Sequence, residues 1–178
     1  MTGRDAKLSN FLDLFEKWNQ RINLSAAKTR LELDEHLEDC LHVVPLLNGH
    51  SRILDVGSGG GFPVVVAAIS LPESRFVALE PVHKKHAFLR TAARELGLSN
   101  LEAFATRIED HAETDYDVAM SRATFDLAEW LDMAIGHVRI GGIAIGFEGQ
   151  RRDDLGEVER VSYVLAGKPR ALVIRRST

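Results

Sequence analysis

The first 48 residues carry apolar positions at helical spacing. Two such runs are present, Phe11–Ile22 and Leu33–Val44, and the second ends just before Pro45. Apolar residues that recur every three to four positions form one face of an amphipathic helix. The pattern therefore predicts two helices, which together form a helical extension over residues 1–48.

From residue 51 onward, short apolar runs alternate with helical ones. They predict a fixed order of elements: strand Arg52–Val56, helix Val64–Leu71, strand Arg75–Glu80, helix His83–Leu96, strands Leu101–Ala105 and Tyr116–Ser121, helix Phe125–Ile135 and strand Val138–Phe147. At the end of the chain, Val158–Leu165 and Ala171–Arg175 flank Gly167–Arg170 and predict an antiparallel hairpin. Strands that alternate with helices indicate an α/β fold, a doubly wound and mainly parallel Rossmann-like sheet. We expect a single domain over residues 1–178, with its core at 51–178.

The composition fits a globular protein in a reducing compartment. The chain has 178 residues, 45% of them hydrophobic, and a formal net charge of −4. We expect neither a membrane span nor a secretory signal, because no long apolar window is present and no apolar run follows a basic start. The lone Cys40 cannot form an intramolecular disulfide. A cytoplasmic location is therefore expected, with Cys40 as a core thiol.

Charge is unevenly distributed along the chain. Residues 150–178 contain seven basic and four acidic side chains, whereas residues 51–149 contain nine basic and fourteen acidic ones. The basic candidates for phosphate contacts are Lys84, Lys85, Arg90, Arg94, Arg151, Arg152, Arg170, Arg175 and Arg176. They would bind phosphates if they share a face with a ligand crevice. As separate solvated charges they would have no such role.

The loop after the first predicted strand has the strongest chemical signal. It reads Asp55-Val-Gly57-Ser-Gly59-Gly-Gly61-Phe-Pro63. Glycines let the backbone turn sharply and approach a ligand closely. The spacing fits neither a dinucleotide fingerprint nor a phosphate-binding P-loop. It is similar to motif I of S-adenosylmethionine methyltransferases, and a glycine-rich turn without a ligand is the alternative.

Glu80 ends the second predicted strand, 19 residues after Gly61. A carboxylate at this place can accept hydrogen bonds from both hydroxyls of an adenosyl ribose, and its charge would repel a 2′-phosphate. An exposed charge at a strand end is the other interpretation.

Several short motifs together resemble one family. They are Trp18-Asn19, Asn23-Leu24-Ser25, His36-x-x-Asp39, the glycine loop, Lys84-Lys85-x-x-Phe88-Leu89, Arg107-Ile-Glu109 and Ser121-Arg122-Ala123. In this order the chain resembles the bacterial glucose-inhibited division protein B family (GidB, or RsmG). That resemblance implies a class I methyltransferase fold, S-adenosyl-L-methionine as cofactor, and N7 of a guanine in 16S rRNA or the small ribosomal subunit as acceptor. From the residues themselves we expect no metal site and no membrane association, and no obligate protein partner is evident.

The resemblance also implies a set of cofactor residues: Asp55, Gly57, Gly59, Gly61, Phe62, Glu80, Ile108, Glu109 and Arg122. The Phe62 ring could face the sulfonium cation or could be a core aromatic. Ile108 and Glu109 could meet the adenine, although Glu109 could also cap a helix. Arg122, the candidate catalytic residue, could hold the methionine carboxylate or a substrate phosphate. A salt bridge from Arg122 to Asp117 or Asp126 is the structural alternative.

Other residues bear on the chemistry. Guanine N7 has no proton to lose, so the expected in-line transfer needs no general base. The pair His83 and His86 is interpreted as a solvated helix face. Trp18 and Asn19 could touch RNA, but a Trp packed on the sheet is favoured.

Departures from the family pattern leave the acceptor open. Val64 and Val66 stand where Gly and Pro are usual, and Glu148 replaces an expected lysine near the crevice mouth. An anion there should weaken RNA contact, although it could also favour the positive charge that develops on a methylated guanine. A divergent enzyme for a small heterocycle or another RNA, and a non-catalytic binding module, therefore remain as alternatives.

Overall fold

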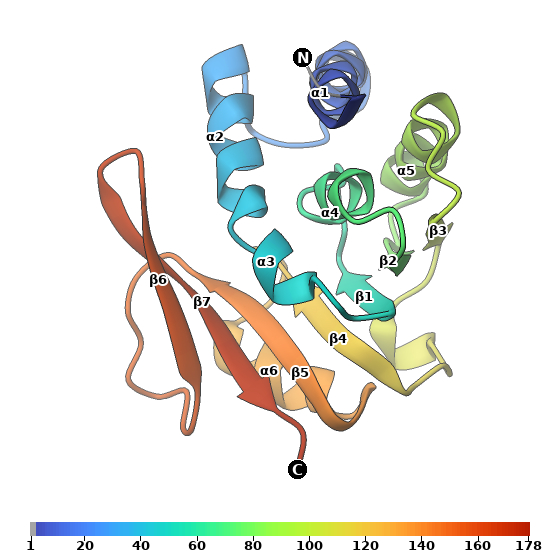
Figure 1. Cartoon of the computed structure of the whole chain (residues 1–178). Helices are drawn as coiled ribbons and strands as arrows, with labels where there is room; N and C mark the ends of the chain where they lie inside the picture. Colours follow the sequence, from blue (N-terminus) through green and yellow to red (C-terminus); the bar gives the residue numbers. More distant parts are fainter. Residues whose placement is uncertain (1–2) are drawn as a thin grey trace.

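The computed structural model describes residues 3–178, which include a seven-stranded sheet (Figure 1). The strands are β1 (Arg52–Val56), β2 (Arg75–Leu79), β3 (Leu101–Phe104), β4 (Tyr116–Ser121), β5 (Val138–Glu148), β6 (Glu159–Leu165) and β7 (Lys168–Arg176). Their order in the sheet is β3-β2-β1-β4-β5-β7-β6. The first five are parallel, and β7 and β6 are antiparallel to their neighbours. The predicted mainly parallel sheet with an antiparallel C-terminal hairpin is confirmed.

The helices are unevenly divided between the two faces of the sheet. They are α1 (Gly3–Ile22), α2 (Arg30–Leu41), α3 (Val44–Leu47), α4 (Val64–Ser70), α5 (His83–Glu95) and α6 (Leu127–Ile135), and a 3-10 turn, η1, lies at Ile108–Asp110. Helices α1 to α5 lie over one face, and α6 covers the other (Figure 1). The β5–β6 connection is a loop, and its buried Leu155 helps to cover the α6 face.

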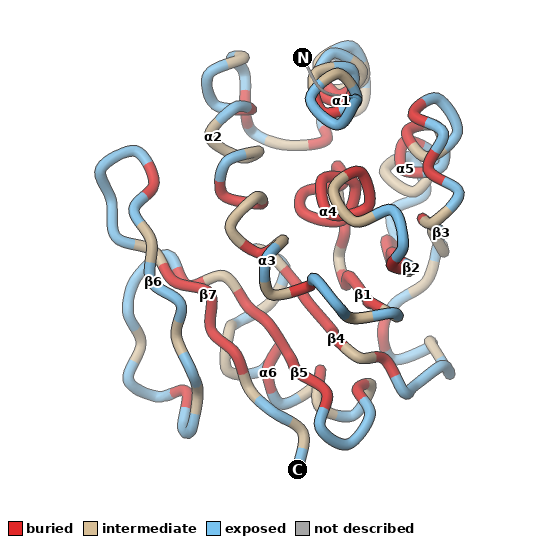
Figure 2. The backbone as a smooth tube through the Cα atoms, in the orientation of Figure 1, coloured by how far each residue is buried: buried red, intermediate tan, exposed pale blue. Residues whose placement is uncertain are grey.

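Alternation along the central strands divides the core in two. In β1, Ile53 packs with the residues of α1, α4 and α5, whereas Leu54 and Val56 pack with those of α6. Successive side chains of a strand point to opposite faces, so a strand covered on both faces is apolar throughout. Figure 2 shows this central region as buried, with exposed residues along the outer hairpin.

Helix α2 begins at a capping box. The Glu32 N–H donates to the Thr29 hydroxyl at 3.2 Å, and the Thr29 N–H donates to the Glu32 carboxylate at 3.0 Å. The predicted single run through Val44 is interrupted, because Pro45 lies in the first turn of the separate helix α3. A proline is accepted there because the first N–H groups of a helix have no intrahelical partner.

Two further expectations need correction. The hairpin turn is Ala166-Gly167, with φ of 48° and 74°, so β7 already begins at Lys168. Positive φ at both central residues is the geometry of a two-residue hairpin turn. Trp18 does not pack on the sheet: its ring lies 5.6 Å from that of Phe88 on α5, within the helical layer. Among the helices described, none has the length and apolar character needed to cross a membrane.

Candidate functional site

The glycine loop lies where the strand order reverses, between β1 and β4. In such sheets ligands bind outside the carboxyl ends of the strands at this switch point. Gly57, Gly59 and Gly61 have φ of 71°, 53° and 90°, a region that favours glycine. A Cβ at Gly57 would lie 2.3 Å from the Thr124 hydroxyl, and one at Gly61 would lie 2.5 Å from Val65. A Cβ at Gly59 would approach no atom closer than 3.8 Å, so this side of the loop is open.

Glu80 holds the loop from the neighbouring strand end. It follows β2, and 4% of its surface is exposed. One carboxylate oxygen accepts the Gly59 N–H at 2.7 Å, and the other accepts the Val82 N–H at 2.8 Å. Glu80 is thus a buried acceptor beside the glycine loop, and the interpretation as an exposed strand-end charge is wrong. Each carboxylate oxygen still has acceptor capacity.

Asp55 is buried without a partner. The residue is 1% exposed, and neither carboxylate oxygen has a hydrogen-bond partner within residues 3–178. The nearby Ser58 hydroxyl donates instead to the backbone carbonyl of Asp55, at 3.1 Å. Burial raises the pKa of the Asp55 carboxyl to about 7, and the charge of Glu80 adds to the rise. Buried polar groups normally have partners, so the Asp55 carboxylate is an acceptor that residues 3–178 leave unsatisfied.

The predicted aromatic and adenine contacts fall in different surroundings. Phe62 is 9% exposed, and its ring packs against Phe11 and Phe15 with centroids 5.1 Å and 5.2 Å away. The structure therefore places Phe62 in the core. Ile108 is buried in η1 on the α6 side, and Glu109 is exposed beside it.

Arg122 leaves β4 into a buried ion pair that was not predicted. Its Nε donates to Asp39 at 2.9 Å, and its Nη2 donates to Nδ1 of His36 at 2.7 Å. The Tyr163 hydroxyl donates to the other oxygen of Asp39, at 2.6 Å. Burial lowers the pKa of His36, and the Arg122 charge lowers it further, which fits a neutral ring that accepts this bond.

The alternative interpretation of Arg122 as part of a salt bridge is therefore confirmed, but the predicted partners are wrong because the carboxylate is that of Asp39. Asp117 binds Arg139, and Asp126 binds Arg152. Sequence reasoning missed His36, Asp39 and Tyr163 as parts of this cluster. The available signal was the His36-x-x-Asp39 spacing, which puts both side chains on one face of α2.

The expected effect of Glu148 also needs correction. Glu148 is 4% exposed, and its carboxylate accepts Nε of Arg160 at 2.9 Å and the Arg152 N–H also at 2.9 Å. The anion is paired with Arg160 at 2.9 Å, so its charge is compensated locally. It cannot repel RNA in the way that the sequence suggested.

The predicted basic residues do not form one patch. Lys84, Lys85, Arg90 and Arg94 lie on α5, which packs at the β3 end of the sheet, while the C-terminal arginines lie at the β6–β7 end (Figure 1). Cys40 is fully buried, as expected, and burial raises the pKa of its thiol. His86 bonds the carbonyl of Ala103 through Nε2 at 3.0 Å, so its ring is not merely solvated. Residues 3–178 contain no group of three or more side chains suited to a metal ion.

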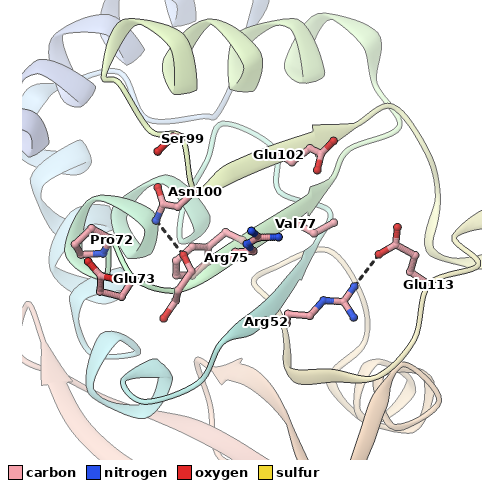
Figure 3. Close-up of a pocket in the computed structure, with 11 residues that line it drawn as sticks. Arg52, Pro72, Glu73, Arg75, Val77, Ser99, Asn100, Glu102 and Glu113 are labelled. Carbon is pink, nitrogen blue, oxygen red and sulfur yellow. Dashed lines mark hydrogen bonds and ion pairs between the residues drawn. The ribbon is translucent and has the colours of Figure 1, made fainter.

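A cavity of about 590 Å³ lies at the opposite edge of the sheet (Figure 3). It is lined at the amino ends of β1 to β3, where Arg52 binds Glu113 at 2.8 Å. The Asn100 amide there donates to the carbonyls of Ala68, Leu71 and Ser74. These groups tie loops together, and the cavity is remote from the glycine loop.

Comparisons with known proteins agree on one family of methyltransferases. A family profile described as "rRNA small subunit methyltransferase G" matches residues 4–173. The chain is 36% identical to ribosomal RNA small subunit methyltransferase G of Syntrophotalea carbinolica, over 92% of this chain and 85% of that protein. It is 40% identical to the protein of the same name from Laribacter hongkongensis, over 83% of this chain and 72% of the relative.

Solved structures show the same fold at low identity. A methyltransferase from Geobacter sulfurreducens superposes with a TM-score of 0.70 at 15% identity, covering 94% of this chain and 89% of the other. A tRNA (m1A58) methyltransferase from Aquifex aeolicus gives 0.61 at 14% identity, covering 79% and 68%. With the profile match over nearly the whole chain and relatives above 30% identity, the chain belongs to the rRNA small subunit methyltransferase G family.

Proposed function

We propose that this chain is an S-adenosylmethionine-dependent methyltransferase that methylates N7 of a guanine in 16S rRNA. The names of its relatives and the methyltransferase fold support the proposal. One observation carries it: the buried Asp55 carboxylate, near the end of β1 and just before a glycine loop whose Gly59 side is open, has no hydrogen-bond partner within residues 3–178. This is the place where an α/β sheet of this order binds its ligand.

The residues at the site fit S-adenosylmethionine. The cofactor's ammonium group offers the donors that the Asp55 carboxylate lacks, and its positive charge would restore the ionised form of that carboxylate. Glu80 keeps acceptor capacity on both oxygens after it has bound the loop, which suits the two ribose hydroxyls. Gly59 lets the cofactor come close to the backbone.

The other predicted residues have supporting roles in this proposal. Ile108 would supply an apolar surface for the adenine, and Glu109 would lie at its edge. Phe62 would support the glycine loop from the core rather than face the sulfonium. Arg122 would position α2 against the end of β4 through Asp39. Its Nη1 makes no hydrogen bond within residues 3–178, so it remains the group that could reach a carboxylate or phosphate in the crevice.

The chemistry asks the chain for positioning more than for proton transfer. S-adenosylmethionine, when bound, supplies a methyl group activated by its sulfonium. Guanine N7 presents an in-plane lone pair and carries no proton, so the chain need not provide a general base. Holding two reactants in line can lower a barrier by roughly 7–11 kcal/mol. The rigid loop fixed by Glu80 is the part of this chain that would do so.

Transfer of labelled methyl from S-adenosylmethionine to three acceptors tests the proposal. The acceptors are assembled small subunits, naked 16S rRNA and free nucleosides. We expect label in the rRNA of the first or second acceptor, and none with Gly59→Val. Label in free nucleosides alone would contradict an rRNA substrate. Cofactor binding without transfer to any acceptor would indicate a binding module instead.

A further inference from the structure

The C-terminal basic residues fall into two groups once their partners are known. Four arginines form ion pairs with carboxylates: Arg152 with Asp126 and Asp154, Arg160 with Glu148, Arg175 with Asp132, and Arg176 with Glu159. Lys168 and Arg170 have no ion pair within residues 3–178, and Arg151 has a long one of 3.4 Å with the exposed Asp153. Exposed ion pairs of this kind contribute little to stability, so Arg151 can exchange Asp153 for another anion at low cost. Three cations are therefore free to meet an external anion.

These three cations line one cavity. It has a volume of about 560 Å³ and lies between the loop after β5 and the β6–β7 hairpin. Lys168 and Arg170 are two residues apart on β7, so they project on the same side of the strand. The Glu148–Arg160 ion pair also lines the cavity, and the two opposite charges leave its wall without a net negative charge.

The cavity is at the same edge of the sheet as the glycine loop. Ala171 pairs with Glu148, so the antiparallel β7 starts where the parallel β5 ends. A Cβ at Gly149 would lie 3.3 Å from Nη1 of Arg170, which shows that this guanidinium rests close to the backbone just after β5. In the sheet, β5 is separated from β1 by β4 alone. Lys168 and Arg170 lie one strand further, on β7, so three strand spacings, about 14 Å, separate them from β1 across the sheet.

A second cavity, also of about 560 Å³, extends this groove toward β4. It shares Arg151, Lys168 and Arg170 with the first and adds the partly exposed Phe125 and Phe147. Phe125 follows Thr124, whose hydroxyl donates to the carbonyl of Gly57 at 3.2 Å. The groove therefore connects the three free cations with the end of β4 and the glycine loop.

We propose that Arg151, Lys168 and Arg170 bind the sugar–phosphate backbone of the RNA strand that presents the acceptor base. Three uncompensated cations in one groove, on a chain whose net charge is −4, select a polyanion. This inference rests on the proposed function. It places the RNA contact on the hairpin end of the sheet, and it gives no role in RNA binding to the basic face of α5.

The double variant Lys168→Gln/Arg170→Gln tests the groove, with Arg176→Gln as the matched control. Arg176 lies on the same strand, but it binds Glu159 at 2.7 Å. For the double variant we expect affinity for small subunits and for naked 16S rRNA to fall about tenfold. The slope of log affinity against log salt should become shallower by about 0.7 for each lost phosphate contact. S-adenosylmethionine affinity should stay unchanged, Arg170→Lys should restore part of the loss, and the control should resemble the wild type.

Three results would contradict the proposal that this groove binds RNA. They are wild-type RNA affinity and salt slope in the double variant, loss of cofactor binding together with RNA binding, and weaker binding to subunits but not to naked rRNA. The last would assign the surface to a ribosomal protein. Failure of the proposed function is distinguishable, because the wild type would then bind RNA without transferring a methyl group to it.

Discussion

Replacing Asp55 by asparagine should stabilise the cofactor-free chain at neutral pH while it weakens cofactor binding. Burial raises the pKa of this carboxyl from 3.8 to about 7. Each pKa unit corresponds to 1.36 kcal/mol, so the ionised carboxylate costs the folded state about 4 kcal/mol above pH 7, as an order of magnitude. Asparagine keeps the shape without the charge.

The pH dependence fixes the sign of this effect. Between pH 4 and pH 7 the folded chain keeps a proton on Asp55 that the unfolded chain has lost, so stability falls as the pH rises. The side-chain amide of the asparagine variant does not titrate. The free energy of unfolding of Asp55→Asn should therefore exceed that of the wild type by a margin that grows across this window and levels off above pH 7.

Urea denaturation at half-unit steps from pH 4 to pH 8 measures that margin. Asp117→Asn is a control of opposite sign. Although burial opposes it, hydrogen bonds from Arg139 and from the backbone N–H groups of Arg52 and Ser51 lower the pKa of Asp117. Because this pKa lies below 3.8, the stabilisation that Asp117 contributes is lost mainly below the pH range of the series, and Asp117→Asn should lower the free energy of unfolding by a nearly constant amount from pH 5 to pH 8. If the free energies of unfolding of the wild type and of Asp55→Asn change in parallel from pH 4 to pH 7, the raised pKa of a buried, unpaired Asp55 carboxyl is refuted.

Four further substitutions separate cofactor binding from stability. Gly59→Val should abolish the binding of S-adenosylmethionine measured by calorimetry, while circular dichroism shows that the chain stays folded. Gly60→Ala should lower the unfolding midpoint, because its Cβ would lie 2.3 Å from an aromatic ring of α1. Arg122→Ala should lower the free energy of unfolding by about 3 kcal/mol in urea and abolish transfer, because it leaves the Asp39 carboxylate buried without its cation; a loss below ~1 kcal/mol would contradict this. Asn100→Ala should cost about 2 kcal/mol with unchanged cofactor affinity, because three carbonyls lose a donor far from the glycine loop.

The strands were predictable because their signals are local. A central parallel strand is buried on both faces, so β1 appears in the sequence as a mainly apolar run, interrupted by Asp55, that stops at Gly57. The position of the hairpin turn could not be predicted, because Ala166 adopts a positive φ and alanine rarely does so. The break between α2 and α3 follows from Pro45. In the sequence this proline marks the end of one helix, but nothing there indicates that a second helix begins at it.

The site was only partly predictable, because its charges are paired over long distances in sequence. Arg122 lies 83 residues from Asp39, and no periodicity links them. Glu148 and Arg160 are paired across the β5–β6 connection, which has no pattern of its own. By contrast, Asp55 is the last residue but one of β1 and Glu80 directly follows β2, each at a fixed spacing from the glycines, so parallel topology alone brings them to one edge.

The identity of the methylated nucleoside is the most direct measurement. Small subunits are incubated with the chain and methyl-labelled S-adenosylmethionine, and the 16S rRNA is digested to nucleosides for mass spectrometry. We expect the label in 7-methylguanosine, with no label in a parallel incubation with Gly59→Val. Label in a different methylated nucleoside, or none in the rRNA of a chain that binds the cofactor, would contradict guanine N7 as the acceptor.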